Sequence, residues 1–353
     1  GGRLLAIPHN GNLSNGLMFD DVTLTARTPL DRGYAERRMR WEPLYEVTQM
    51  KGDGETHPAL SPNDGFANFE RWDKASFGPV PKTREMLPRE YAREAYKRGL
   101  AYESRVGANP FKFGMVGSTD SHTSLPTTQE DNFFGKVVLL EPTKDPIRFD
   151  EVIAGRPAPT GSQIYARETS ASGLAGVWAR DNTRESIWDA MARKEVFATT
   201  GTRLLVRVFG GFDFSASDLD RSDFAEHGYE RGVPMGGDLK GAAPGTVPTF
   251  LVRAVRDADG ANLDRVQVIK GWLDGTSKTH EQVYDVAWSG CRKPGRDGQL
   301  PPVGNTVNVS EATYTNAIGA PFLTAFWKDP AFDPTQRAFY YVRVIEIPTP
   351  RWT

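Results

Sequence analysis

Two residues with metal-binding side chains stand close together in the first half of the sequence. Asp120 and His122 are separated by one residue and follow a short apolar segment, residues 113–116. In an extended segment, residues two apart point to the same side. A carboxylate oxygen and an imidazole nitrogen can therefore reach one point, as a divalent metal ion requires. The alternative interpretation is a turn in which Asp120 bonds to nearby backbone groups.

A third candidate ligand, His9, ends another apolar segment. Residues 4–7 (LLAI) predict a buried strand, and Pro8 prevents that strand from continuing as a hydrogen-bonded ladder. Because α/β folds place their active sites at the carboxyl ends of strands, we expect His9 to share one mouth with Asp120 and His122. A hydrogen-bonded histidine in a loop is the alternative for each ring taken singly.

Glu46 stands on a further predicted strand, and a polar loop follows it. Glu46 is a candidate metal ligand or a residue that orients one. In the loop, Lys51 is a candidate for neutralising an anionic substrate group, and Glu55 and His57 are candidates for substrate binding. Arg184 is a second candidate for charge neutralisation. A structural salt bridge at Glu46 and a solvated Lys51 are the alternatives.

The elements that must position these residues alternate between strand and helix over residues 1–202. Apolar residues at helical spacing predict helices over residues 88–102 and 183–194, the second with Thr183 as its capping residue. This alternation is typical of an α/β layer or barrel. Buried strands are predicted at residues 4–7, 44–49, 114–117 and 137–141.

Residues 203–353 have a different pattern, with alternating apolar residues and Asp-Gly turn signals, which predicts an all-β sandwich domain. The boundary is expected at residues 199–202. Residues 257–260 (DADG) begin like a calcium-binding loop, but Val268 occupies the position that requires Glu, so we predict a hairpin turn there. Strands are predicted at residues 204–209, 249–255, 265–271, 282–288 and 338–347.

Composition excludes several classes of protein. Lys and Arg number 43 against 45 Asp and Glu, so no strongly basic surface predicts nucleic-acid binding. No apolar run approaches the roughly 18 residues that a membrane-spanning helix needs. The single cysteine, Cys291, excludes a disulfide scaffold and a zinc finger. The sequence begins Gly1-Gly2 without Met, so we expect a mature or truncated product whose true beginning lies upstream, and a periplasmic or secreted location stays open.

Five stretches of the sequence resemble the DUF3604 family, which is similar to the PHP (polymerase and histidinol phosphatase) superfamily of metal-dependent phosphoesterases. The resemblance implies a distorted β/α barrel that carries two or three divalent metal ions, Zn, Mn or Fe, at its strand ends. The stretches are residues 6–12 (AIPHNGN), 45–58 (YEVTQMKGDGETHP), 117–122 (GSTDSH), 196–203 (VFATTGTR) and 340–352 (YYVRVIEIPTPRW).

The resemblance also implies roles for single residues. His9 matches a superfamily histidine at the end of a late strand, Asp120 and His122 match its closing D-x-H pair, and Glu46 falls on the strand between them. The opening H-x-H pair of the superfamily has no counterpart in this sequence. We therefore expect the C-terminal part of a longer enzyme, or a chain whose companion chain or N-terminal segment supplies the other half of the metal site.

The function expected from these observations is that of a metal-dependent hydrolase, a phosphoesterase that uses a metal-activated water on a small phosphorylated substrate. Asp120 would bridge metal ions or orient the nucleophile, and this chain alone is expected to hold metal poorly. The alternative is a non-catalytic binding or scaffold protein, with a degenerate barrel and a β-sandwich that recognises a ligand or partner.

Overall fold

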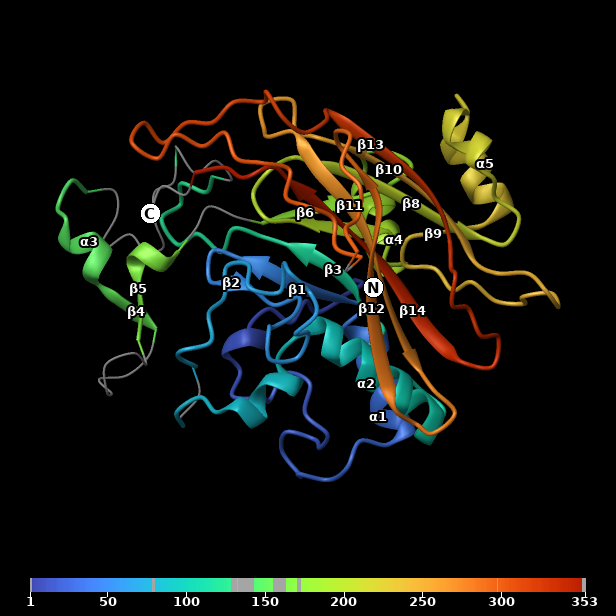
Figure 1. The fold of residues 1–353 in the computed structure, drawn as a ribbon. Helices are drawn as coiled ribbons and strands as arrows, with labels where there is room; N and C mark the ends of the chain where they lie inside the picture. Colours follow the sequence, from blue (N-terminus) through green and yellow to red (C-terminus); the bar gives the residue numbers. More distant parts are fainter. Residues whose placement is uncertain are drawn as a thin grey trace. The chain divides into compact units, whose positions relative to one another are not determined.

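The computed structural model describes residues 2–77, 80–127, 132, 143–154, 163–169, 173–296 and 298–350. The chain divides into two compact units, with the boundary between Thr202 and Arg203. In Figure 1 the first unit is coloured from blue to green and the second from yellow to red. No helix in the described part is long and apolar enough to cross a membrane.

The first unit mixes short strands with helices. Its central sheet has the strand order β2-β1-β3, and β4–β5 and β6–β7 form two-stranded antiparallel pairs. The elements are η1 (Gly11–Leu13), α1 (Arg32–Trp41), β1 (Leu44–Gln49), β2 (Gly52–Asp53), η2 (Arg84–Arg89), α2 (Ala92–Val106), β3 (Gly114–Gly117), α3 (Ile147–Asp150), β4 (Val152–Ala154), β5 (Ile164–Tyr165), η4 (Ala166–Glu168), β6 (Leu174–Val177), α4 (Arg184–Ala192) and β7 (Val196–Thr199).

Strands β1 and β3 are parallel, so their carboxyl ends lie at the same edge of the sheet. Glu46 is in register with Val116, and Thr48 is in register with Gly117. The register shifts between these two pairs, so the regular strand pairing is interrupted directly after Glu46. The sequence prediction of both strands is confirmed, whereas the predicted strand at residues 137–141 lies outside the described residues.

The predicted strand at residues 4–7 is wrong. Its backbone hydrogen bonds run from Ala6 N to the carbonyl of Trp41, the last residue of α1, and from Glu46 N in β1 to the Pro8 carbonyl. Because Pro8 has no N–H, it cannot extend these contacts into a ladder. The segment still contributes to the core, since Leu5 and Ile7 pack against the buried cluster of Leu44, Val116 and Val196.

An aromatic cluster forms the main core of the first unit. Phe19, Tyr45 and Phe113 lie with ring centroids 5.1–5.6 Å apart, and Phe111 packs edge-on against Phe19. Helix α2 covers this cluster with a face of small and aromatic side chains. The helix begins later than predicted, because Pro88 lies in the preceding turn η2. The core thus holds β1, the strand that carries Glu46, in place.

The second unit consists mainly of two antiparallel sheets, with strand orders β13-β10-β8-β9 and β12-β11-β14. Rings join the two sheets: Phe250 lies 4.8 Å from Tyr340, and Tyr284 lies 5.0 Å from Trp327, between centroids. In the part of the chain that is described, the strands do not close into a barrel. The elements are β8 (Leu205–Gly211), η5 (Ala216–Asp220), α5 (Phe224–Arg231), β9 (Val233–Pro234), β10 (Thr249–Val255), β11 (Leu263–Leu273), β12 (Thr279–Trp288), β13 (Phe322–Lys328) and β14 (Arg337–Glu346).

The hairpin predicted at residues 257–260 is wrong. This turn follows β10 and precedes β11, and these strands belong to different sheets. It is therefore a connection between sheets, in which Asp257 accepts backbone hydrogen bonds from Arg203 and Asp259. The true hairpin joins β11 to β12, where the Asp274 carboxylate bonds to the backbone of the turn.

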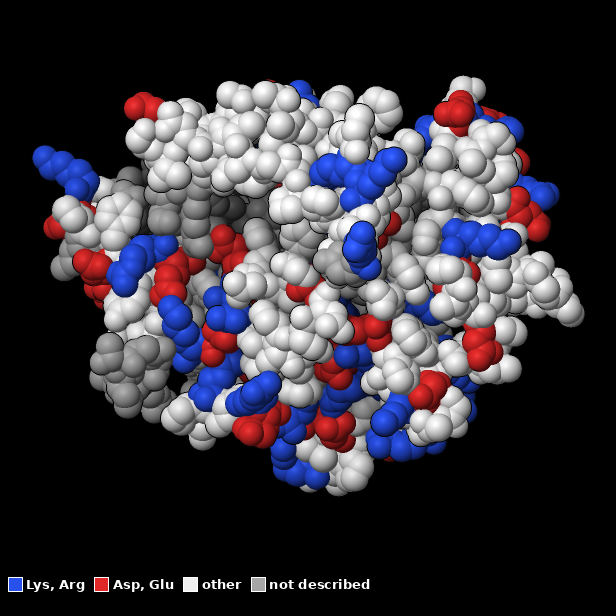
Figure 2. Space-filling view, viewed as in Figure 1, with Lys and Arg blue, Asp and Glu red and all other residues white. Residues whose placement is uncertain are grey.

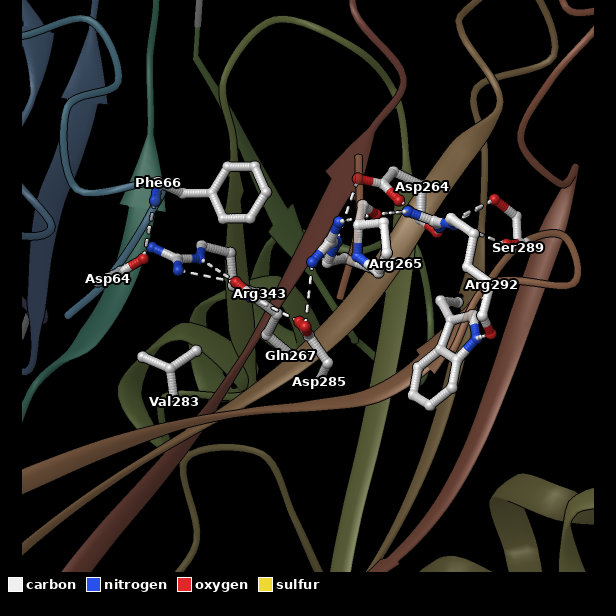
Figure 3. A network of polar contacts seen from close by, with 12 residues as sticks. Asp64, Phe66, Asp264, Arg265, Gln267, Val283, Asp285, Ser289, Arg292 and Arg343 are labelled. Carbon is white, nitrogen blue, oxygen red and sulfur yellow. Dashed lines mark hydrogen bonds and ion pairs between the residues drawn. The ribbon is translucent and has the colours of Figure 1, made fainter. Parts of the chain in front are cut away.

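Buried charges lie on strands β11 and β12 of the second unit (Figure 3). Arg265 contacts the carboxylates of Asp264 and Asp285, and Arg292 forms an ion pair with Asp264. The side-chain amide of Gln267 donates to Asp285. The four charged side chains are therefore paired with one another.

Candidate functional site

Polar side chains gather where β1 and β3 end. The carboxylate of Glu46 accepts a hydrogen bond from the Gln49 side-chain amide at 2.6 Å and another from the Ser118 hydroxyl, and it interacts electrostatically with Lys51 and His9. We call these five residues the strand-end cluster. They come from three segments: the stretch after residues 4–7, the end of β1 with its turn, and the end of β3. Parallel pairing and the hydrogen bond from Ser118 N to the Thr48 carbonyl bring the segments together.

Burial dominates the electrostatics of Glu46. It raises the pKa of this carboxyl above its ordinary value, because the charged form loses hydration. The Lys51 ammonium, the Gln49 amide, the Ser118 hydroxyl and the nearby His9 act in the opposite direction, and burial outweighs them. A cation bound beside Glu46 would therefore relieve an unfavourable burial of charge.

His9 is oriented in the way that metal-binding histidines commonly are. Its ring is exposed, and Nδ1 lies 3.3 Å from the Ile7 carbonyl oxygen. A carbonyl can only accept, so Nδ1 carries the proton in this contact and the neutral ring keeps its lone pair on Nε2. Metal ligands typically donate their other ring N–H to a carbonyl or carboxylate in this manner. The chemistry of His9 thus fits a metal ligand.

Asp120 and His122 do contact each other, but not through an extended segment. Asp120 has a φ of 51°, in the left-handed region, so the backbone turns at this residue. His122 Nε2 lies 3.1 Å from Asp120 Oδ1, and the side chains are 57% and 28% exposed. The pair follows Ser118, whose hydroxyl reaches Glu46. Aspartate adopts the left-handed conformation more readily than most non-glycine residues, so this φ marks a turn and does not by itself indicate a functional site.

The donor types fit a divalent transition metal, since imidazole nitrogens and carboxylate oxygens are its usual ligands. The number of ligands is too small for a metal site, because no three His, Cys, Asp or Glu side chains in the described ranges are grouped so that they could hold an ion. Gln49 adds a further acceptor. The residue is 1% exposed, and its buried Oε1 has no hydrogen-bond partner. Among the described residues, the cluster therefore does not make up a metal site by itself.

Three other predicted site residues, Glu55, His57 and Arg184, make different contacts. His57 is buried, with Nδ1 accepting from Ala59 N and Nε2 lying 3.0 Å from Asp73 Oδ2. Both ring nitrogens of His57 are thus occupied within the protein. Glu55 forms a 2.7 Å ion pair with the fully buried Arg93. Arg184 is exposed in the first turn of α4.

Gln49 and Ser118 were not among the predicted site residues. Each is a polar residue at the end of a buried strand, and this position in the sequence could have identified both as candidates. Lys51 was predicted to be a substrate contact, but it is 4% exposed and its ammonium bonds to the His9 carbonyl.

Neither positive nor negative charge predominates on the face of the molecule shown in Figure 2. Figure 2 shows Lys and Arg side chains intermixed with Asp and Glu on the face viewed, especially around α1 and α2. This matches the formal net charge of -2.

Comparison with known proteins identifies one family. A family model described as a protein of unknown function, DUF3604, matches residues 1–353. No curated protein and no solved structure matches the chain. The match carries no statement about the PHP superfamily.

Proposed function

The chain belongs to the DUF3604 family, and we propose that it supplies part of the metal site of a metal-dependent hydrolase that acts on phosphoesters. The observation that carries the proposal is the strand-end cluster, in which the partly buried Glu46 carboxylate interacts with His9 and Ser118 at the edge of a parallel strand pair. Asp120 and His122 directly follow Ser118. This edge is where α/β proteins hold their catalytic groups.

Four residues would hold divalent transition metal ions, Zn, Mn or Fe: His9, Glu46, Asp120 and His122. When bound, such ions supply an activated water and polarise a phosphoryl oxygen. The chain's own residues prepare the ligands. Gln49 orients the Glu46 carboxylate, and the Ile7 carbonyl keeps the Nε2 lone pair of His9 available.

The complete site needs more donors than the described residues group together. We propose that a segment of a longer enzyme, or a companion chain, supplies them, and that two or three ions then bind. On this view the first unit is part of a distorted β/α barrel like those of the PHP superfamily, and the second is a β-sandwich. The parallel β1–β3 pair supports the former, and the ring contacts between the two sheets support the latter.

The test is metal content and metal affinity of the full chain. We expect isothermal titration with Mn²⁺ to give binding that weakens in Glu46→Gln and His9→Gln. The matched control is His280→Gln, because His280 pairs with Asp274 on the β11–β12 hairpin. Elemental analysis of the purified protein and hydrolysis of p-nitrophenyl phosphate and its diester complete the test. Equal binding by wild type and Glu46→Gln, or no binding at all, would contradict the proposal.

A second candidate function is that of a non-catalytic binding or scaffold protein. One observation favours it: no group of three metal-type side chains occurs in the part of the chain that the structure describes. Its two sheets would then recognise a ligand or partner. The same titration separates the two candidates, since the scaffold requires neither metal binding nor hydrolysis.

A further inference from the structure

Lys270 and Asp329 form a buried pair that joins the two sheets of the second unit. Lys270 lies on the central strand β11 of one sheet, and Asp329 directly follows β13 of the other. The Lys270 Nζ lies 2.7 Å from Asp329 Oδ2, and the two side chains are 3% and 0% exposed. Taking both charges out of water costs free energy that their mutual attraction often does not offset. An amine held against a carboxyl in this way is also a pair of reactants.

Aromatic rings lie around the pair. Lys270 Nζ lies 5.3 Å from the centroid of the Trp272 ring and 5.9 Å from that of the Tyr340 ring. Phe250 of the facing sheet lies 4.8 Å from Tyr340, between centroids. Isolated charges are costly in such apolar surroundings, so a proton can pass from the ammonium to the carboxylate and leave a neutral amine and a carboxylic acid. These are the forms that condense to an amide.

Each carboxyl oxygen of Asp329 has the hydrogen-bond donor that acyl transfer requires. The Ala331 backbone N–H donates to Oδ1 at 2.9 Å, and negative charge develops on this oxygen when an amine attacks Cγ. The Tyr340 hydroxyl donates at 2.6 Å to Oδ2, the oxygen that also contacts Lys270. Burial and this hydrogen bond raise the pKa of Tyr340, so the phenol keeps the proton that a general acid donates.

We propose that Lys270 and Asp329 condense to an intramolecular isopeptide bond that links the two sheets covalently. Nζ attacks Cγ, the C–N bond forms, and the bond from Cγ to Oδ2 breaks. The ammonium loses two protons, one directly to Oδ2 and one by way of the Tyr340 hydroxyl, so Oδ2 leaves as water. Tyr340 ends the reaction unchanged, and no oxidant, metal ion or cofactor takes part. This inference does not depend on the function proposed above.

The amide would find its hydrogen-bond partners already in place. The Ala331 carbonyl accepts from Nζ at 2.7 Å, and the Ala331 N–H donates to Oδ1. The amide N–H and its carbonyl oxygen keep these two bonds, so two buried charges become one neutral group with its polar atoms paired. The link also closes a loop between residues 59 apart in sequence, which restricts the unfolded chain as a disulfide does.

The intact mass of the purified full chain under denaturing conditions tests the bond. We expect a mass lower than that calculated from the sequence by one water molecule. Tryptic digestion should give residues 266–278 joined to residues 329–337, with cleavage after Lys270 blocked. A wild-type chain of full calculated mass would overturn the proposal. So would a mass deficit without the joined peptides, because an aspartate can also lose water by forming a cyclic imide with its own backbone.

Lys270→Arg is the sharpest variant, because its guanidinium keeps a cation beside Asp329 but stays protonated and cannot attack the carboxyl. It should have the full calculated mass, as should Asp329→Ala. A deficit that persists in Lys270→Arg would place the lost water elsewhere and overturn the proposal. Tyr340→Phe should slow bond formation by about 10²–10⁴-fold, followed as the linked fraction of freshly purified protein over time. The masses and peptides of wild type decide the question even where a variant fails to fold.

The Lys82–Glu90 pair is the matched control within the same chain. Lys82 Nζ lies 2.8 Å from Glu90 Oε2, and these side chains are as deeply buried, at 4% and 0% exposed. In the described part of the chain, Glu90 Oε2 receives no hydrogen bond from a hydroxyl, so no acid is placed on the oxygen that would leave. The peptides that contain Lys82 and Glu90 should therefore be recovered unlinked. A link there as well would show that burial alone is sufficient, and would overturn the role given to Tyr340.

Discussion

Gln49 donates a 2.6 Å hydrogen bond to the carboxylate of Glu46, three residues earlier on β1. Gln49 is also the last residue of the strand, in register with Gly52 where the chain turns back into β2. The side chain therefore spans from the turn to the carboxylate. Because the amide group can rotate only as a unit, fixing Nε2 on Glu46 also fixes the direction of the buried Oε1.

The raised pKa of Glu46 predicts how stability depends on pH. Glu46 is protonated more readily when folded than when unfolded, so its contribution to stability is full below its ordinary pKa of 4.5 and is lost as pH rises through the raised value. In metal-free buffer, the free energy of unfolding of wild type minus that of Glu46→Gln should therefore fall between pH 4.5 and neutrality. Urea unfolding at several pH values measures it. A difference that grows with pH would contradict the pKa direction.

Gly11→Ala should destabilise the first unit strongly. A Cβ at this position would lie 2.0 Å from Tyr45 Oη and 2.6 Å from the Glu90 carbonyl oxygen. Overpacking of this kind costs about 1–3 kcal/mol or more. Thermal unfolding measures the loss, and Gly65→Ala is the control, since a Cβ there meets nothing within 4 Å. Adding Tyr45→Phe should recover part of the stability, because it removes the nearer of the two atoms.

Arg93→Met should lower the free energy of unfolding by about 3–5 kcal/mol, the usual effect of breaking a buried ion pair. The Arg93 guanidinium is fully buried and lies 2.7 Å from both Glu55 and Asp64. Its removal leaves the almost fully buried Asp64 carboxylate without this compensation. Arg32→Met, which removes the exposed pair with Glu36, should change stability by about 0–1 kcal/mol. Urea denaturation compares the two, and similar small effects would show that the buried charges are not coupled.

In the second unit, Asp264→Ala should likewise lower the free energy of unfolding (Figure 3). Asp264 is 4% exposed and forms ion pairs with Arg265 and Arg292. Leaving two guanidinium groups without this carboxylate should destabilise the protein by about 3–5 kcal/mol. Asp223→Ala, which removes an exposed ion pair with Arg221, serves as the control. Denaturant unfolding followed by tryptophan fluorescence reports the difference, and a loss no larger than that of the control would count against the network.

Much of the strand arrangement could be predicted from the sequence because the strands are short apolar runs with clear ends. Strand β10 has the predicted bounds, as do the two strands that carry the strand-end cluster. Helix α5, in contrast, was not predicted. Gly228 in its middle weakens the helical pattern, and the structure requires this glycine because a Cβ would lie 2.4 Å from the Phe209 ring. Tertiary packing here overrides local preference.

The candidate site could be predicted in its residue types but not in its contacts. The sequence places Glu46 on a strand and His9 after an apolar segment, and the two side chains interact electrostatically, although the segment before His9 is not a strand. It does not reveal that His57 is buried against Asp73, because burial of a loop depends on residues distant in sequence. Nor does any local pattern in the sequence indicate that Lys51 bonds to the backbone of His9.

The parallel pairing of β1 and β3 has a consequence for the order of events during synthesis. Residues 50–113 separate these strands, so their pairing closes a long loop, which makes it a slow step. The β11–β12 hairpin of the second unit is synthesised later but closes across a five-residue turn, residues 274–278, so it can form locally as soon as its strands emerge. The sheet edge that bears Glu46 does not exist until the ribosome has released the chain as far as Ser118. In a nascent chain shorter than that, Glu46 and Ser118 cannot yet lie side by side.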